Sequence, residues 1–159
     1  MSERKRIDKS DLVRELCAAI AEKERLTAQQ ADAAHRAATH EESVPENDKD
    51  TRALEASYLA GAQAARAREL KAIQNRLSFV PLHAFGENSE IGLTAIVTLQ
   101  SGAKQTLYFL MPYGGGVKLR ADAVTVVTPE AALGQAILGL TLGESFVVGG
   151  REYEVVAIA

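Results

Sequence analysis

The stretch DLVRELCAAIAEKERLTAQQADAAHRAAT, residues 11–39, decides the fold of the first half of the chain, and it contains neither glycine nor proline. Leu12, Leu16 and Ile20 recur every four residues, so they share one face of a helix. Alanines continue this spacing farther along. The stretch therefore predicts one long helix whose packing face narrows from leucine to alanine.

The ends of this helix and the start of a second one are marked in the sequence. Asp8 or Ser10 can cap the start. Val44-Pro45 places the end near His40, because the residue before a proline is driven out of the helical region. A second helix is expected to begin within residues 48–50, which supply acids suited to a helix N-terminus, and to run to about residue 78.

The two expected helices are joined by a short connection, which favours an antiparallel hairpin. On the second helix we predict one apolar stripe of Leu59, Leu70, Ile73 and Leu77 beside another of Leu54, Tyr58, Gly61 and Ala65. Leu12, Leu16 and Ile20 would lie opposite Leu70, Ile73 and Leu77 at the base of the hairpin. A bundle of three or four shorter helices is the alternative.

Residues 79–159 differ in composition, with 11 of the 12 glycines. Strands are predicted over 92–99, 105–111, 124–127, 144–148 and 152–158, from β-branched runs separated by turn residues. Thr128 is expected to cap a short helix that ends at Gly139. The predicted fold class is α+β, with a hairpin arm over residues 1–78, its tip near 41–50, and a small sheet domain over 79–159.

Composition excludes several classes of protein. One cysteine, Cys17, cannot form an intrachain disulfide, and a reduced cytoplasmic location is expected. No run reaches the about 18 apolar residues of a membrane span. A net charge of −3 excludes a basic nucleic-acid coat. His35 and His40 lack the spacing of a helical zinc pair. We find no self-contained active site.

Carboxylates crowd the predicted bend of the hairpin. They are Glu41, Glu42, Glu46, Asp48 and Asp50, with Lys49 the one base among them. Such clustering gives no folding advantage, because like charges repel. One interpretation is a solvated loop with acids at the second helix start. The other is a group of oxygen ligands that approach Mg²⁺ held by a partner. The spacing does not match a calcium loop.

Two segments of the second half resemble a known family. VTPEAALGQAILG (127–139) and GGREYEVV (149–156) resemble the helix segment and the final hairpin of the Gre-type (GreA/GreB-like) transcript cleavage factors of bacterial RNA polymerase. The resemblance covers residues from about 10 to 159. It implies an FK506-binding-protein-like (FKBP-like) sheet domain and a coiled-coil arm.

The resemblance also implies a function at the tip. The family's motif reads roughly Gly-Asp-Leu-x-Glu-Asn-Ala-Glu-Tyr, and Glu46-Asn47 matches its Glu-Asn. An ungapped match puts Ser43 at the family's Asp position, and one inserted residue puts Glu42 there. The expected site residues are Glu42, Glu46 and Asp50, with Glu41 and Asp48 as substitutes. Glu42 and Glu46 would share Mg²⁺ of the polymerase active site, and the chain would hold no cofactor of its own.

The expected partner is therefore bacterial RNA polymerase. The arm would enter the polymerase through its secondary channel, and the chain would act on the backtracked RNA 3′ end only indirectly. The chain would be a monomer, would bind nucleic acid weakly by itself, and would stimulate the polymerase's nuclease without being an enzyme. One rival is a secondary-channel regulator that does not cause cleavage. Others are a coiled-coil adaptor and a prolyl isomerase or chaperone, whose pocket would be lined from Tyr108, Phe109, Tyr113, Phe146 and Tyr153.

Overall fold

The computed structural model describes residues 6–42 and 47–159, and the side chains of residues 40–50 lie outside that description. Two compact units are present. One is Cys17–Ser78, and the other combines the residues up to Leu16 with Phe79–Ala159. The first helix therefore contributes its opening turns to the second of these units.

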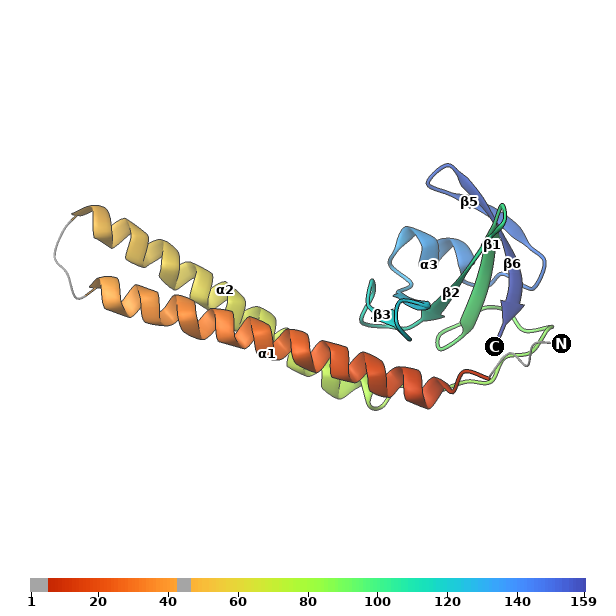
Figure 1. Cartoon of the computed structure of the whole chain (residues 1–159), viewed down its shortest axis with the longest axis horizontal. Coiled ribbons are helices and arrows are strands. Elements are labelled where there is room, and N and C mark those ends of the chain that lie inside the picture. The colour runs from red at the N-terminus through yellow and green to blue at the C-terminus, as the bar shows by residue number, and fades with distance from the viewer. Residues whose placement is uncertain (1–5, 43–46) are drawn as a thin grey trace. The chain divides into compact units, whose positions relative to one another are not determined.

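The unit Cys17–Ser78 is a pair of long helices, α1 (Lys9–Glu42) and α2 (Asn47–Leu77), which lie alongside each other (Figure 1). This confirms the hairpin and rejects the bundle of shorter helices. Asp8 is the cap of α1, because its Oδ1 accepts a hydrogen bond from the backbone N–H of Ser10 at 2.8 Å.

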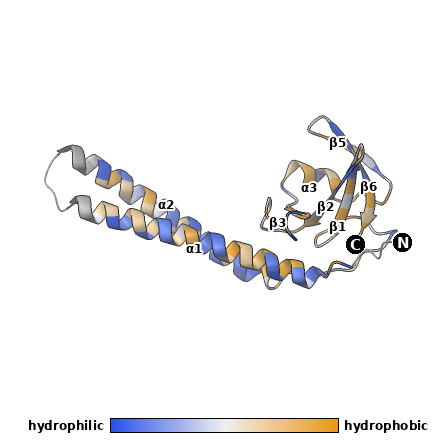
Figure 2. Ribbon diagram, viewed as in Figure 1, coloured by the Kyte–Doolittle hydropathy of each residue, from blue (hydrophilic) through white to orange (hydrophobic). Residues whose placement is uncertain are grey.

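Buried side chains on both helices recur at intervals of seven residues. They are Ile20 and Thr27, Ala31 and Ala38, then Ala53, Ala60 and Ala67, and finally Leu70 and Leu77. This is the repeat of a coiled coil. Alanine supplies most of the seam, so the two backbones can approach closely. In Figure 2 short orange bands alternate with blue and white along both helices.

The predicted stripes of α2 are wrong in part. Leu59 is 54% exposed, Leu54 55% and Tyr58 72%. Gly61 is also exposed, with open space around its Cα. These residues lie outside the seven-residue repeat, which places Ala60 in the seam and turns its neighbour Leu59 outward. The four-residue spacing of bulky side chains was misleading, because here the smallest residues make the contact.

The other unit is built on one six-stranded mixed sheet (Figure 1). Its strands are β1 (Ile96–Ser101), β2 (Lys104–Leu110), β3 (Lys118–Leu119), β4 (Val124–Val127), β5 (Ser145–Val148) and β6 (Arg151–Ile158), in the order β3-β4-β2-β1-β6-β5. Only the β2–β4 pair is parallel. The α+β class is confirmed, while the FKBP-like assignment stays a prediction.

The helix α3 (Ala132–Ile137) shares its core with one face of this sheet. Ile137 belongs to the same buried cluster as Val97, Leu99 and Val155. Alternate residues of β1 supply this face, as the period of a strand requires. With six residues α3 is about 9 Å long, so it covers only part of a strand of about 20 Å.

Apart from one-residue shifts at the ends of β2, β5 and β6, three features of the sheet unit differ from the sequence-based prediction. Strand β1 begins at Ile96 instead of residue 92, because Thr94 has a left-handed backbone (φ 71°) that interrupts the extended run. The cap of α3 is Ala131 rather than Thr128, because Thr128 closes a turn by accepting the N–H of Ala131 at 3.1 Å. The two-residue strand β3 was not predicted, being too short to carry a pattern.

Other predicted features are confirmed. Gly139 follows the end of α3 with φ 83°, the left-handed conformation common just after a helix. Gly149 and Gly150 both have positive φ (60° and 76°) between β5 and β6, as a tight hairpin turn requires. Within the described residues no helix is long and apolar enough to cross a membrane.

Candidate functional site

The acidic segment sits where α1 ends and α2 begins. Glu41 and Glu42 are the last two residues of α1, whereas Asp48 and Asp50 lie in the first turn of α2. Glu46 falls in the gap between the described ranges, and the side chains of the other four acids are likewise outside the description. The predicted pairing among these carboxylates is therefore untested.

The arm beneath this segment carries one polar side chain in its seam and several ion pairs on its exposed surface. Thr27 lies in the seam at 8% exposure and satisfies its hydroxyl by donating to the carbonyl of Lys23 at 2.7 Å. Exposed ion pairs line the outside: Glu22–Arg25, Asp32–Arg36 and Arg66–Glu69. The guanidinium of Arg25 lowers the pKa of Glu22 by hydrogen bonding. Polar pairs of this kind suit a surface that stays in water.

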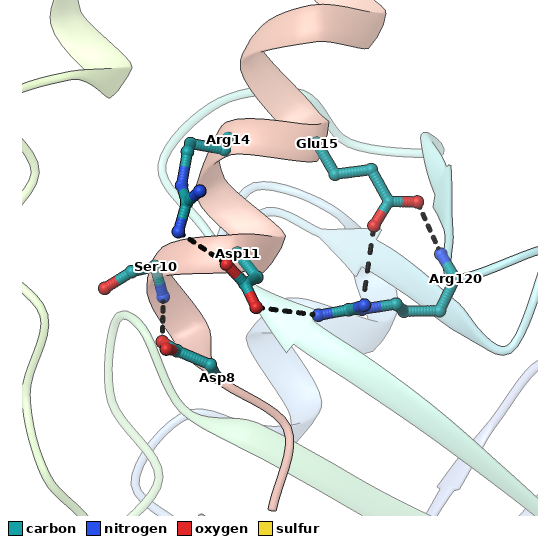
Figure 3. Close-up of polar contacts among 6 residues, drawn as sticks. All are labelled: Asp8, Ser10, Asp11, Arg14, Glu15 and Arg120. Carbon is teal, nitrogen blue, oxygen red and sulfur yellow. Dashed lines mark hydrogen bonds and ion pairs between the residues drawn. The ribbon is translucent and has the colours of Figure 1, made fainter.

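A polar cluster fixes the first turns of α1 within the sheet unit (Figure 3). Arg120 follows β3, and its backbone N–H donates to Glu15 Oε1 at 2.7 Å. Its guanidinium also lies 3.7 Å from Glu15 Oε2 and 3.5 Å from Asp11 Oδ2. Asp11 additionally accepts from Arg14 one turn along the helix. The carboxylates of Asp11 and Glu15 in α1 thus bind the turn that follows β3 through Arg120.

The turn that they hold has an unusual backbone. Arg120, Ala121 and Asp122 have φ of 54°, 51° and 69°, three left-handed residues in succession without a glycine. Such conformations cost free energy and persist only where surrounding contacts stabilise them. The hydrogen bond that the Arg120 N–H donates to the Glu15 carboxylate is one such contact.

Apolar and basic contacts add to this attachment. Leu16 is fully buried, and its Cδ1 lies so close to Gly114 that a Cβ there would be 2.7 Å away. Lys9 Nζ donates to the carbonyl of His83 at 2.6 Å and lies 4.6 Å from the ring centroid of Phe85. Burial lowers the pKa of this lysine.

A hollow of about 400 Å³ lies in the sheet unit at the turn end of the β1–β2 hairpin. It is lined by Leu99, Ser101, Gly102, Lys104, Thr106, Tyr108, Arg151 and Tyr153. Strand alternation places Leu99 on the face that packs with α3, and α3 is too short to cover that face completely. Burial raises the pKa of Tyr108, and the charge of Tyr153 adds to the effect.

The five aromatic residues predicted for a pocket separate into different roles. Tyr108 and Tyr153 do line the hollow. Phe146 stacks on Tyr153, with ring centroids 5.5 Å apart. Phe109 is fully buried and Tyr113 does not belong to the lining. The hollow is thus partly aromatic and partly basic.

Among the residues that the structure describes, no group of three or more His, Cys, Asp or Glu side chains is arranged to hold a metal ion. Cys17 is half-buried, and burial raises its pKa, so its thiol is the protonated form at neutral pH.

These features define a class of protein, in which a long two-helix arm is joined to a small mixed-sheet unit that also takes in the first turns of the arm. In this layout the chain is similar to Gre-type transcription factors of known structure. No family model matches the sequence, and a search of curated proteins finds no match.

Three solved structures illustrate this similarity. GreA factor homologue 1 of Thermus thermophilus is 20% identical, covering 90% of this chain and 94% of its own, with a TM-score of 0.40. The same factor of Thermus aquaticus is 22% identical, covering 90% of each chain, with a TM-score of 0.38. The elongation factor GreA/GreB of Nitrosomonas europaea is 15% identical, covering 56% and 77%, with a TM-score of 0.35.

Sequence reasoning missed two functional groupings. The contact between Glu15 and Arg120 joins residues 105 positions apart, and neither lies in a recognisable motif. The hollow joins residues of β1, β2 and β6, and only strand register brings Lys104 and Arg151 to one end of the sheet. Alternation within each strand could have shown which side chains share the face, but not where α3 would stop.

Proposed function

We propose that this chain is a transcription elongation factor that inserts its helical arm into the secondary channel of bacterial RNA polymerase. Two lines of support are the resemblance of residues 127–139 and 149–156 to Gre-type factors and the helical hairpin itself. The observation that carries most weight is the seam between two helices of 34 and 31 residues, in which Ala31, Ala38, Ala53, Ala60 and Ala67 make most of the contact and the bulkier Ile20, Leu70 and Leu77 lie toward the start of α1 and the end of α2.

The dimensions of the arm suit a narrow channel. At 1.5 Å per residue α1 is about 51 Å long and α2 about 46 Å. Alanine contacts allow helix axes to approach toward the lower end of the usual range, about 8 Å. A slender rod of this length can reach a site that a compact domain cannot enter. Five acids in residues 41–50 are then carried at its far end.

In this proposal the reaction belongs to the polymerase, and the chain is not an enzyme. Glu42, Glu46 and Asp50 supply carboxylate oxygens beside the polymerase's Mg²⁺, with Glu41 and Asp48 as substitutes. Oxygen ligands of this kind suit Mg²⁺. A carboxylate can also accept a hydrogen bond from water and orient it toward the phosphodiester of backtracked RNA. The role of the chain is to add carboxylate oxygens to the active site of the polymerase.

A regulator that binds the channel without promoting cleavage is the second candidate. The ungapped motif match favours it, because it places Ser43 where the family has Asp, and a hydroxyl is a weaker metal ligand than a carboxylate. Both candidates use the same arm and the same partner. The two candidates differ in whether the tip promotes RNA cleavage once the arm is in the channel.

The experiment is RNA cleavage in halted, backtracked polymerase complexes. The full chain should release 3′ RNA fragments faster than polymerase alone. Glu42→Ala, Glu46→Ala and Asp50→Ala, made singly, should identify the pair by lowering the rate by about 10²-fold or more, as loss of a charge-stabilising group does elsewhere. Glu55→Ala removes the same charge from an exposed position of α2 beyond the acidic segment and should leave cleavage unchanged.

Two negative results have different meanings. Binding to polymerase without fragments rejects cleavage and supports the regulator. Failure to bind polymerase in a pull-down rejects both and leaves the coiled-coil adaptor. The prolyl isomerase alternative has only the two tyrosines of the hollow in its favour. An isomerisation assay on a proline peptide that shows no acceleration would remove it.

A further inference from the structure

The hollow beside β1, β2 and β6 has a chemistry that the proposed function does not use. We propose that it is a binding site for a nucleoside phosphate, whose base packs against Tyr108 and Tyr153 and whose phosphate lies between Lys104 and Arg151. The inference is independent of the acidic segment and of the polymerase channel, because every residue involved belongs to the sheet unit.

The strand register places these side chains together on one face. Lys104, Thr106 and Tyr108 are alternate residues of β2, and Arg151 and Tyr153 are alternate residues of β6. Strand β1 lies between β2 and β6. Neighbouring strands are about 4.8 Å apart, so the side chains of β2 and β6 stand on either side of a space about 10 Å wide.

The two cations of the hollow are available to a ligand. Residues 79–159 contain four Lys or Arg, and two of them line this hollow. Arg120 is engaged with Glu15 and Asp11, whereas within the described residues the side chains of Lys104 and Arg151 make no hydrogen bond or ion pair. Free cations beside a concave surface attract phosphate, and arginine can bind it with two parallel hydrogen bonds.

The remaining lining suits the rest of the molecule. Tyrosine rings offer flat apolar surfaces on which any of the nucleic-acid bases can stack. Phe146 supports Tyr153 from behind by stacking, which holds that ring in place. The hydroxyls of Ser101 and Thr106 can donate or accept hydrogen bonds with a ribose. The volume of about 400 Å³ falls within the range of small-ligand pockets.

An uncharged peptide fits this lining less well. Its carbonyl groups can accept hydrogen bonds from the lining, but it carries no negative charge to pair with the two cations, and hydrogen bonds between charged partners are the stronger ones. The charge of the hollow therefore favours an anion with a flat apolar body over a purely apolar ligand.

The experiment is an NMR titration of the ¹⁵N-labelled full chain with adenosine 5′-monophosphate, adenosine, and inorganic phosphate in parallel. The monophosphate should shift the amides of Lys104, Thr106, Tyr108, Arg151 and Tyr153 saturably. Each of the two partial ligands should bind more weakly by about tenfold or more, because each loses one half of the contacts. Binding should weaken as salt is raised.

Variants distinguish binding in the hollow from nonspecific attraction of phosphate to positive charge. Lys104→Ala and Arg151→Ala should each weaken binding of the monophosphate by about tenfold, the effect of one charge-assisted contact. Lys118→Ala removes the same charge from β3, an edge strand that β4 separates from β2, and should leave binding unchanged. Far-UV circular dichroism confirms that each variant is folded. Tyr153→Phe keeps the ring and should bind the base nearly as well as the unaltered chain.

Four results would overturn the proposal: no saturable shift, an equal loss with Lys118→Ala, adenosine binding as tightly as the monophosphate, or a neutral proline peptide binding the same residues more tightly. None of these bears on RNA cleavage, which is measured separately. Failure of the cleavage assay would likewise leave the nucleotide titration intact.

Discussion

Gly134 in α3 lies against the carbonyl oxygen of Thr128, so closely that a Cβ on Gly134 would be 1.9 Å from that oxygen. The contact joins the first half of the short helix to the turn that precedes it. It involves backbone atoms on the Thr128 side, which cannot rotate away as a side chain can. Close approach, rather than a left-handed conformation, requires glycine here.

Gly134→Ala should therefore destabilise the chain strongly. Overpacking against backbone costs about 1–3 kcal/mol or more in the free energy of unfolding. Urea unfolding followed by circular dichroism measures it. Gly61→Ala is the matched control, because Gly61 is exposed in the middle of α2 with nothing within 4 Å of the added carbon. That change should stabilise by about 0.5–1 kcal/mol. Equal effects at the two positions would contradict the contact.

Glu15 stabilises a left-handed turn, so its carboxylate should matter more for its hydrogen bond than for its charge. Glu15→Ala should lower the free energy of unfolding by about 1 kcal/mol. Glu15→Gln keeps an oxygen that can accept the Arg120 N–H and should cost less. The ion pair itself is exposed and contributes little, since such pairs are worth about 0–1 kcal/mol. Thermal melts of both variants decide this, and a larger loss with Gln than with Ala would reject the argument.

Ala60 and Leu59 are neighbours in α2 with opposite surroundings. Ala60 is 8% exposed in the seam and Leu59 is 54% exposed. Ala60→Glu buries a charge between two helices and should destabilise by about 2–4 kcal/mol. Leu59→Glu introduces the same charge into water and should change stability by about 0.5 kcal/mol or less. Far-UV melting curves compare the two. If the leucine variant loses more, the seven-residue seam is wrong.

Glu22 provides a test by pH. Its pKa is lowered chiefly by the hydrogen bond from Arg25. A carboxyl with a lower pKa in the folded chain binds fewer protons there than when unfolded. Its contribution to stability is therefore present above the unfolded pKa and is lost as the pH falls through the folded one. Carboxyl ¹³C titration should show the Glu22 pKa moving up toward its ordinary value in Arg25→Gln. No movement would show that the pair is not formed in solution.

The sequence predicts the elements well wherever a local signal exists. Long runs without glycine or proline define both helices, and the two glycines at residues 149–150 define the last hairpin. The seam of α2 could not be read from hydrophobicity, because the exposed Leu54 and Leu59 are larger and more apolar than the buried Ala53, Ala60 and Ala67. A period of seven was present in the alanines, but bulky residues beside them gave a stronger and misleading pattern.

The candidate sites differ in how far the sequence could predict them. The acidic segment is visible directly, since its five carboxylates fall within ten consecutive residues, 41–50. The hollow is not, because its cations are 47 residues apart and meet only through the pairing of β1 with both β2 and β6. Thr94 shows the same limit. Its side chain accepts the N–H of His83 at 2.9 Å, and that long-range bond accompanies the left-handed backbone that delays β1.

The seven-residue seam has a consequence for how the arm could change its reach. Seven residues advance a helix by about 10 Å and return its packing face to nearly the same direction. Insertion of one whole repeat into each helix, at matching positions, would lengthen the arm in one step and keep the alanines in contact. An insertion of one or two residues would instead turn the seam away from its partner helix. The arm is thus a structure whose length is set in discrete increments, and related chains should differ in arm length by whole repeats.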